Sequence, residues 1–148
     1  MRTLHAMAPT DPIAWILQEC KTIAVVGLSP KPWRDSYRIA QYMQRSGWRI
    51  IPVNPNASEI LGERAYASLS LAARSEHIDL VNVFRNSQDV PPIADEAIAI
   101  GARALWLQLG IAHAQAAQHA QAAGLVVVQD RCLKVEHARR AGPPGVAR

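Results

Sequence analysis

The chain has 148 residues, of which 49% are hydrophobic and 19% charged, so its composition fits one globular domain and excludes a disordered chain. Its net charge is +4, with thirteen arginines among sixteen basic residues, which fits an ordinary solvated surface or an anionic partner. Basic and aromatic residues do not alternate as they do in nucleic-acid-binding surfaces, so we expect no nucleic-acid partner. Since no apolar run reaches about 18 residues and no N-terminal signal segment is visible, we expect no membrane partner and a cytoplasmic location.

Strand and helix patterns alternate along the chain. In chain order, the sequence predicts a helix over 10–20, a strand over 22–26, a helix over 36–46, a strand over 48–53, a loop with a short helix near its end over 54–73, a strand over 77–84, a helix over 87–101, a strand over 104–110, a helix over 112–124, a strand over 125–130 and a helix over 132–140. Strands that alternate with such helices predict an α/β fold, a doubly wound parallel five-stranded sheet with helices on both faces. Residues 10–140 would form this single domain, and residues 1–9 and 141–148 would be flexible termini.

The ends of two helices have clear local signals. Thr10 or Asp11 is expected to cap the first helix, with Pro12 in its first turn. Gly47 follows the second predicted helix, at the position where glycine commonly ends helices.

The loop after the first strand, GLSPKPWRDS, is the strongest candidate for a binding site, because ligands of such sheets bind beyond the carboxyl ends of the strands. It has Gly27 alone in place of G-x-G-x-x-G. Gly27 would let a ligand approach the backbone, Ser29 would offer a hydroxyl and an N–H, and Ser36 would cap the next helix or donate to an oxygen. Lys31 and Arg34 add positive charge near a helix N-terminus. The loop therefore predicts either a phosphate site or a rigid proline-containing turn with two solvated cations.

The loops after the second and third strands are less specific. Asn54 and Pro55 stand where NAD-binding domains carry an acidic residue for the ribose, which argues against NAD. Asn54 could instead form a turn with its own backbone. Phe84, the only phenylalanine, either caps the core or borders the crevice, and Arg85 is placed to reach a phosphate or a carboxylate.

Five stretches, taken together, resemble the stand-alone CoA-binding domain family. They are IAVVGLSPKPWRDSYRIAQYM, GWRIIPVNPN, ILGERAYASL, DLVNVFRNSQDVPPIADEAIAIGARALWLQLGI and GLVVVQDRCLKVEHAR. The resemblance runs from about Asp11 to Arg139 in the same order. The family is similar to the CoA-binding domain of the succinyl-CoA synthetase alpha subunit and of ADP-forming acyl-CoA synthetases.

The resemblance implies a Rossmann-like fold that binds coenzyme A, free or acylated. It implies phosphate contacts at Gly27, Leu28, Ser29, Lys31 and Arg34, adenosine contacts at Asn54 and Pro55, a path toward the pantetheine along Val83, Phe84 and Arg85, and closure of the crevice at Gln108 and Gly110. A coenzyme with a pyrophosphate and a 3′-phosphate would use the extra cations of the first loop. An acidic ribose anchor would repel the 3′-phosphate, which agrees with its absence after the second strand.

The cysteines and histidines suggest little chemistry. Cys20 and Cys132 lack C-x-x-C spacing and, with five scattered histidines, form no zinc pattern, so we predict no metal site and reduced thiols. Cys132 is the candidate reactive thiol, able to form a mixed disulfide with CoA, because it begins a helix at the ligand edge. The alternative is a buried, unreactive cysteine. His137, in KVEHAR, is interpreted as a surface or packing residue rather than a phosphorylated histidine.

We therefore expect a non-catalytic CoA- or acyl-CoA-binding protein that acts as a carrier, sensor or regulator. The full synthetases that the family resembles carry a second domain with a phosphorylated histidine, so no acyl-CoA ligase activity is expected from this chain alone. Two alternatives remain open: a NAD(P)- or nucleotide-binding enzyme subunit, and a redox sensor. A homo-oligomer or an unidentified protein partner is compatible with the sequence.

Overall fold

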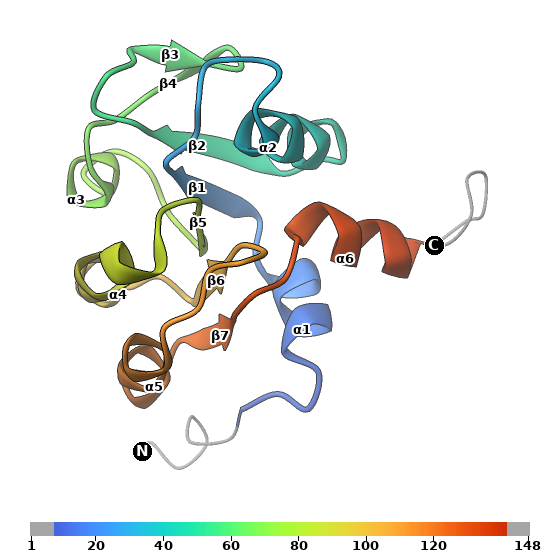
Figure 1. The fold of residues 1–148 in the computed structure, drawn as a ribbon, viewed down its shortest axis with the longest axis vertical. Helices are drawn as coiled ribbons and strands as arrows, with labels where there is room; N and C mark the ends of the chain where they lie inside the picture. Colours follow the sequence, from blue (N-terminus) through green and yellow to red (C-terminus); the bar gives the residue numbers. More distant parts are fainter. Residues whose placement is uncertain (1–7, 142–148) are drawn as a thin grey trace.

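Five parallel strands form the centre of the molecule (Figure 1). The computed structural model describes residues 8–141, so the expectations for residues 1–7 and 142–148 lie outside the described part. The strands are β1 (Thr22–Val26), β2 (Arg49–Val53), β5 (Leu80–Val83), β6 (Ala104–Leu107) and β7 (Val126–Val128). Their order in the sheet is β2-β1-β5-β6-β7, and every neighbouring pair is parallel. The predicted doubly wound five-stranded sheet is confirmed.

Helices cover both faces of the sheet, as predicted (Figure 1). One face carries α1 (Pro12–Glu19), α2 (Asp35–Arg45) and α6 (Leu133–Ala141), and the other carries α3 (Leu69–Ala72), α4 (Val90–Ala99) and α5 (Ala114–Ala122). Since side chains alternate along a strand, Val25 packs beneath the first set of helices and Val26 beneath the second. Two hydrophobic cores result, one on each face.

The predicted helix ends are confirmed. Asp11 caps α1, where its Oδ1 accepts a hydrogen bond from the Ala14 N–H (3.1 Å), and Pro12 is the first helical residue. Helix α2 ends at Arg45, and Gly47 follows with a φ of +110°, a conformation that glycine adopts without strain.

Besides shifts of one to three residues at the ends of several helices and strands, the structure differs from the sequence prediction in the following elements. A short antiparallel hairpin, β3 (Glu59–Ile60) and β4 (Glu63–Arg64), lies in the predicted 54–73 loop, because strands of two residues give no periodic signal. The strand predicted over 77–84 is limited to β5, which pairs with β1 only from Leu80 onward. The 87–101 helix begins as a 3₁₀ turn, η2 (Ser87–Asp89), before the proline-containing first turn of α4.

The strand order fixes where a ligand could bind. The chain runs from β1 outward to β2, and then crosses back to β5 on the other side of β1. The carboxyl ends of β1 and β5 therefore flank the point at which the strand order reverses, which is where open α/β sheets bind ligands.

Candidate functional site

Gly27 lies at the reversal point, in close contact with the loop after β5. Its φ is +88°, and its N–H donates to the Val53 carbonyl oxygen (3.0 Å). A Cβ at this position would lie 2.5 Å from the carbonyl oxygen of Phe84. The Phe84 N–H in turn donates to the Val26 oxygen (2.8 Å). The loops after β1, β2 and β5 are thus held together around a residue that has to be glycine.

The loop between β1 and α2 is closed by its own hydrogen bonds. The Ser29 N–H donates to Ser36 Oγ (3.0 Å), and Ser29 Oγ accepts from the Lys31 N–H (3.1 Å). The Arg34 N–H donates to the Lys31 oxygen (3.0 Å). The Ser29 N–H, which we expected to contact a ligand, therefore already donates a hydrogen bond within the loop. The hydroxyl protons of both serines remain available to an acceptor.

Helix α2 begins one residue before its predicted start, so Ser36 does not cap it. Arg34 is the N-cap residue, and its side chain makes no capping hydrogen bond. The first backbone N–H groups of the helix consequently have no side-chain acceptor. Lys31, Arg34 and Arg38 are exposed around this helix end, together with one exposed carboxylate, Asp35, so positive charge prevails here.

Asn54 ties the second loop to the first. Its Nδ2 donates to the Leu28 oxygen (2.9 Å), and its Oδ1 accepts from the Asn56 N–H (2.7 Å). Both ends of the amide are thus used within the protein, which supports the turn-forming interpretation of Asn54. Leu28 is fully buried, and Pro55 is exposed beside the turn.

The residues after β5 contribute mainly backbone to this edge. The Val83 side chain is fully buried in the core under α3, α4 and α5, and Phe84 is half-buried against the opposite core. Arg85 is exposed and contacts a carboxylate of its own chain, Asp89, at 3.3 Å. Because exposed ion pairs are weak, Arg85 could exchange this partner for a ligand at little cost.

The loops after β6 and β7 are joined to each other. Gln108 is buried, and its Oε1 accepts from the Leu133 N–H (3.3 Å) at the start of α6. The Gly110 N–H donates to Asp130 Oδ1 (2.7 Å). The Trp106 indole N–H donates to the Arg131 oxygen (2.8 Å). Gln108 and Gly110 therefore connect these two loops at the far side of the same edge.

Cys132 lies where the sequence placed it, immediately before α6. Its carbonyl oxygen accepts from the Glu136 N–H (2.9 Å), and its side chain is half-buried against the core beneath α1, α2 and α6. His137, one turn later, is buried in the contact between α6 and α2, where its Nδ1 lies 2.7 Å from the Tyr42 hydroxyl and its ring packs edge-on against Trp48. The packing interpretation of His137 is confirmed.

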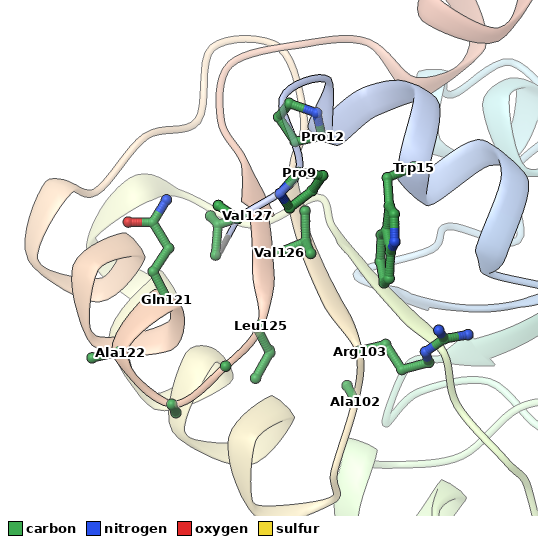
Figure 2. Close-up of a pocket in the computed structure, with 13 residues that line it drawn as sticks. Pro9, Pro12, Trp15, Ala102, Arg103, Gln121, Ala122, Leu125, Val126 and Val127 are labelled. Atoms are coloured by element: carbon green, nitrogen blue, oxygen red, sulfur yellow. The ribbon is translucent and has the colours of Figure 1, made fainter. Parts of the chain in front are cut away.

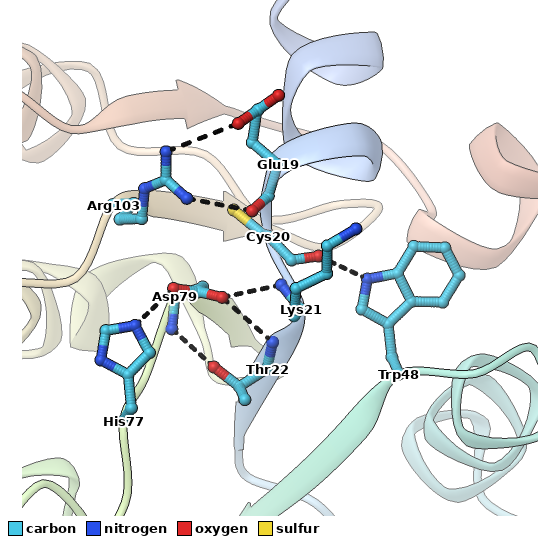
Figure 3. A network of polar contacts seen from close by, with 8 residues as sticks. All are labelled: Glu19, Cys20, Lys21, Thr22, Trp48, His77, Asp79 and Arg103. Atoms are coloured by element: carbon cyan, nitrogen blue, oxygen red, sulfur yellow. Dashed lines mark hydrogen bonds and ion pairs between the residues drawn. The ribbon is translucent and has the colours of Figure 1, made fainter.

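The opposite end of the sheet holds a polar network that Figure 3 shows around Asp79. The Asp79 carboxylate accepts from the backbone N–H groups of Lys21 (2.7 Å) and Thr22 (3.3 Å) and contacts His77 Nε2 at 2.8 Å. Burial by itself would raise the pKa of Asp79, but these hydrogen bonds and the neighbouring imidazole outweigh it, so the pKa lies below its usual range. Burial, reinforced by the Asp79 charge, raises the pKa of Cys20 to about 12.

A groove of about 960 Å³ lies beside the edge strand β7, away from the predicted site (Figure 2). Its walls are mostly apolar, with Trp15, Leu125 and Val127 among them. Its single charged side chain is Arg103, which lies over the Trp15 ring at 5.1 Å and donates to the Glu19 oxygen at 3.0 Å. The groove thus offers little that could hold a phosphate.

Trp33 is the residue at this edge that the sequence reasoning missed. It is 64% exposed in the loop between β1 and α2, with Lys31 and Arg34 on either side. The available signal was its position inside a cation-containing loop directly after the first strand.

The described residues contain neither a metal-binding cluster nor a membrane-spanning helix. Within residues 8–141, no group of three or more His, Cys, Asp or Glu side chains is placed to hold a metal ion. Nor does that part of the chain contain a helix with the length and hydrophobicity needed to cross a membrane.

Known proteins resemble this chain in sequence, in fold, or in both. YneT of Bacillus subtilis (strain 168), an uncharacterized protein, is 44% identical over 123 residues, which are 83% of this chain and 90% of YneT. A hypothetical protein from Pyrococcus horikoshii OT3 is 34% identical, with a TM-score of 0.82 over 92% of this chain and 100% of that one. The dinucleotide forming acetyl-coenzyme A synthetase 1 of Ca. Korarchaeum cryptofilum shares the fold at 21% identity, with a TM-score of 0.67 over 77% of this chain and 27% of that longer one.

The family described as the CoA binding domain matches residues 21–138. This range includes all five strands of the sheet and every loop at its carboxyl edge. The chain therefore belongs to the CoA-binding domain family.

Proposed function

We propose that this protein binds coenzyme A, free or acylated, along the carboxyl edge of its sheet, and that binding rather than catalysis is its function. The observation that carries the proposal is the uncapped N-terminus of α2, which stands among Lys31, Arg34 and Arg38 directly after Gly27. Backbone N–H groups of a helix N-terminus together with flanking cations favour phosphate. The pyrophosphate and 3′-phosphate of CoA would occupy this region.

The rest of the edge suits an elongated ligand. Three strand spacings separate β2 from β6, a distance of about 14 Å at about 4.8 Å per spacing. Asn54 and Pro55 border the β2 end, where the adenosine would lie, and Gln108 and Gly110 border the β6 end, toward which the pantetheine would extend. The absence of an acidic residue at position 54 or 55 suits a ribose that carries a 3′-phosphate better than the free ribose of NAD.

A non-catalytic role is supported by how the candidate chemical groups are used. His137 is packed between α6 and α2, and the His77–Asp79 pair lies at the amino end of the sheet. Gln108 and Asn54 are engaged in hydrogen bonds that hold loops together. A carrier, sensor or regulator of CoA needs this edge as a binding surface and nothing more.

Calorimetric titration with CoA, dephospho-CoA, NAD and ATP under reducing conditions tests the proposal. We expect CoA to bind more tightly than dephospho-CoA, because the latter lacks the 3′-phosphate. Binding of NAD alone would overturn the proposal and favour a NAD-linked enzyme subunit or a redox sensor.

Single substitutions locate the phosphates. We expect Lys31→Ala and Arg34→Ala each to weaken CoA binding by roughly 1.5–3 kcal/mol, the range of a charge-assisted hydrogen bond. Arg45→Ala is the matched control, because it removes the same charge from the exposed C-terminal end of the same helix. Unchanged affinity in both loop variants would exclude this loop as the phosphate site.

A further inference from the structure

Trp33 is presented to solvent by a tight turn at the candidate site. The Arg34 N–H donates to the Lys31 oxygen (3.0 Å), so residues 31–34 form a β-turn with Pro32 and Trp33 at its centre. Proline suits the first central position because its φ is already fixed. The indole is 64% exposed, and it is the largest of the four exposed large hydrophobic side chains in residues 8–141.

Unlike Trp33, the other three tryptophans are buried or partly buried against the protein. Trp48 and Trp106 donate their indole N–H groups to the carbonyl oxygens of Cys20 and Arg131. Trp15 packs under the Arg103 guanidinium, 5.1 Å from it. The indole N–H of Trp33 has no hydrogen-bond partner among the described residues, so folding alone does not account for a tryptophan at position 33.

The surroundings of Trp33 indicate which ligand group its ring would contact. Lys31 Nζ lies 6.0 Å from the ring centroid, and Arg34 is the next residue along the turn. An aromatic face beside cations is the combination with which proteins hold a nucleobase and its phosphates, because the base stacks on the ring while the cations pair with the phosphate oxygens. The pantetheine has no planar ring that could stack in this way.

We infer that Trp33 is the residue that stacks on the adenine ring of the coenzyme. The inference rests on the proposed CoA-binding function and adds a residue that the resemblance did not supply. It places the base beside the cations of the first loop, to which the Asn54 turn is tied by its hydrogen bond to the Leu28 oxygen. Since the ring is already exposed on a closed turn, stacking requires no rearrangement of the fold.

Three ligands separate adenine stacking from the other contacts: CoA, adenosine 3′,5′-bisphosphate, which lacks the pantetheine, and 4′-phosphopantetheine, which lacks the adenine. We expect Trp33→Leu to weaken binding of the first two by roughly 5- to 150-fold, the range for one base stacked on one aromatic ring, and to leave the third unchanged. Trp33→Phe should restore much of the loss. Trp15→Leu, which changes a tryptophan beside the β7 groove, is the control and should bind all three ligands like the wild type.

Each outcome has one meaning. Binding of CoA by Trp33→Leu within twofold of the wild type would overturn the inference while leaving the proposed function intact. Equal weakening for all three ligands would show that the substitution disturbs the turn, and would also overturn stacking. If the wild type binds none of the three, the proposed function fails and the inference fails with it.

Discussion

Replacing Gly27 with alanine tests whether the loops after β1 and β5 are held in contact as the structure shows. Gly27 has a φ of +88°, and an added Cβ would lie 2.5 Å from the Phe84 oxygen, where real Cβ contacts are essentially never closer than 3.0 Å. That oxygen belongs to backbone, and the Phe84 N–H is fixed to Val26. A rotamer change therefore cannot relieve the overlap.

The expected cost has two parts. An alanine at this positive φ costs about 1–2 kcal/mol. Forcing the backbone of Phe84 away adds about 1–3 kcal/mol, the usual cost of overpacking. Gly27→Ala should therefore lower the free energy of unfolding by about 2–5 kcal/mol.

Gly101→Ala is the matched control. Gly101 has a similar φ of +76°, but an added Cβ would meet nothing within 4 Å. Its substitution should cost only the conformational part, about 1–2 kcal/mol. The difference between the two variants measures the close contact alone.

Urea denaturation gives both values, provided that the slope m is unchanged. Equal destabilisation of the two variants, within about 0.5 kcal/mol, would refute the close approach of Gly27 to Phe84. Under the proposed function, Gly27→Ala should also weaken CoA binding, since Gly27 begins the loop that would contact the phosphates, whereas Gly101→Ala should leave binding unchanged.

Two further predictions concern groups outside the binding loop. Asp79→Asn should destabilise the protein by about 1.5–3 kcal/mol at pH 7, because the hydrogen bonds to Lys21 and Thr22 lose their charged acceptor. Folding lowers the pKa of Asp79, so the carboxylate's contribution to stability is complete above the unfolded pKa of about 3.9 and is lost as the pH falls through the folded pKa. The stabilities of wild type and variant should therefore converge in acid. A difference that stays constant in urea melts down to pH 2 would contradict this. A thiol reagent should label Cys132 in the folded protein and Cys20 only after unfolding, because burial raises the pKa of Cys20 to about 12. If folded Cys132→Ser were labelled at the wild-type rate, Cys20 would be the reactive thiol and the prediction would be wrong.

Much of the fold could be predicted from the sequence, because strands buried on both faces are continuously apolar and the helices between them carry clear end signals. TIAVV and the Asp11–Pro12 helix start are examples. The hairpin around Leu61 and Gly62 escaped because it depends on two residues with positive φ, +56° and +77°, rather than on any periodic pattern. The ends of β6 and β7 were also placed too far out: the predicted strands included Gln108 and Asp130, whose side chains instead form hydrogen bonds between the loops after β6 and β7.

The sequence predicted the positions of the candidate site residues but not the hydrogen bonds among them. Gly27, Lys31 and Arg34 lie where the sequence placed them, because a residue's distance from the end of a strand fixes its place at the sheet edge. Sequence could not show that the Ser29 N–H is already bound to Ser36, since that bond depends on how the loop folds back onto α2. For the same reason an exposed Trp33 could not be told from a buried one.

The two ends of the sheet are built differently, and the difference bears on function. At the amino end, the Asp79 carboxylate is satisfied by backbone N–H groups and an imidazole, as befits a structural contact. At the carboxyl end, hydrogen bonds from the Asn54 and Gln108 side chains hold neighbouring loops together. The N-terminus of α2, however, has no side-chain cap, and Trp33 is exposed. A rigid frame around unsatisfied donors lowers the ordering cost of binding, because the loops need not be fixed when the ligand arrives. Under the proposed function, the exposed N–H groups of α2 and the exposed indole of Trp33 are the groups that would contact the coenzyme.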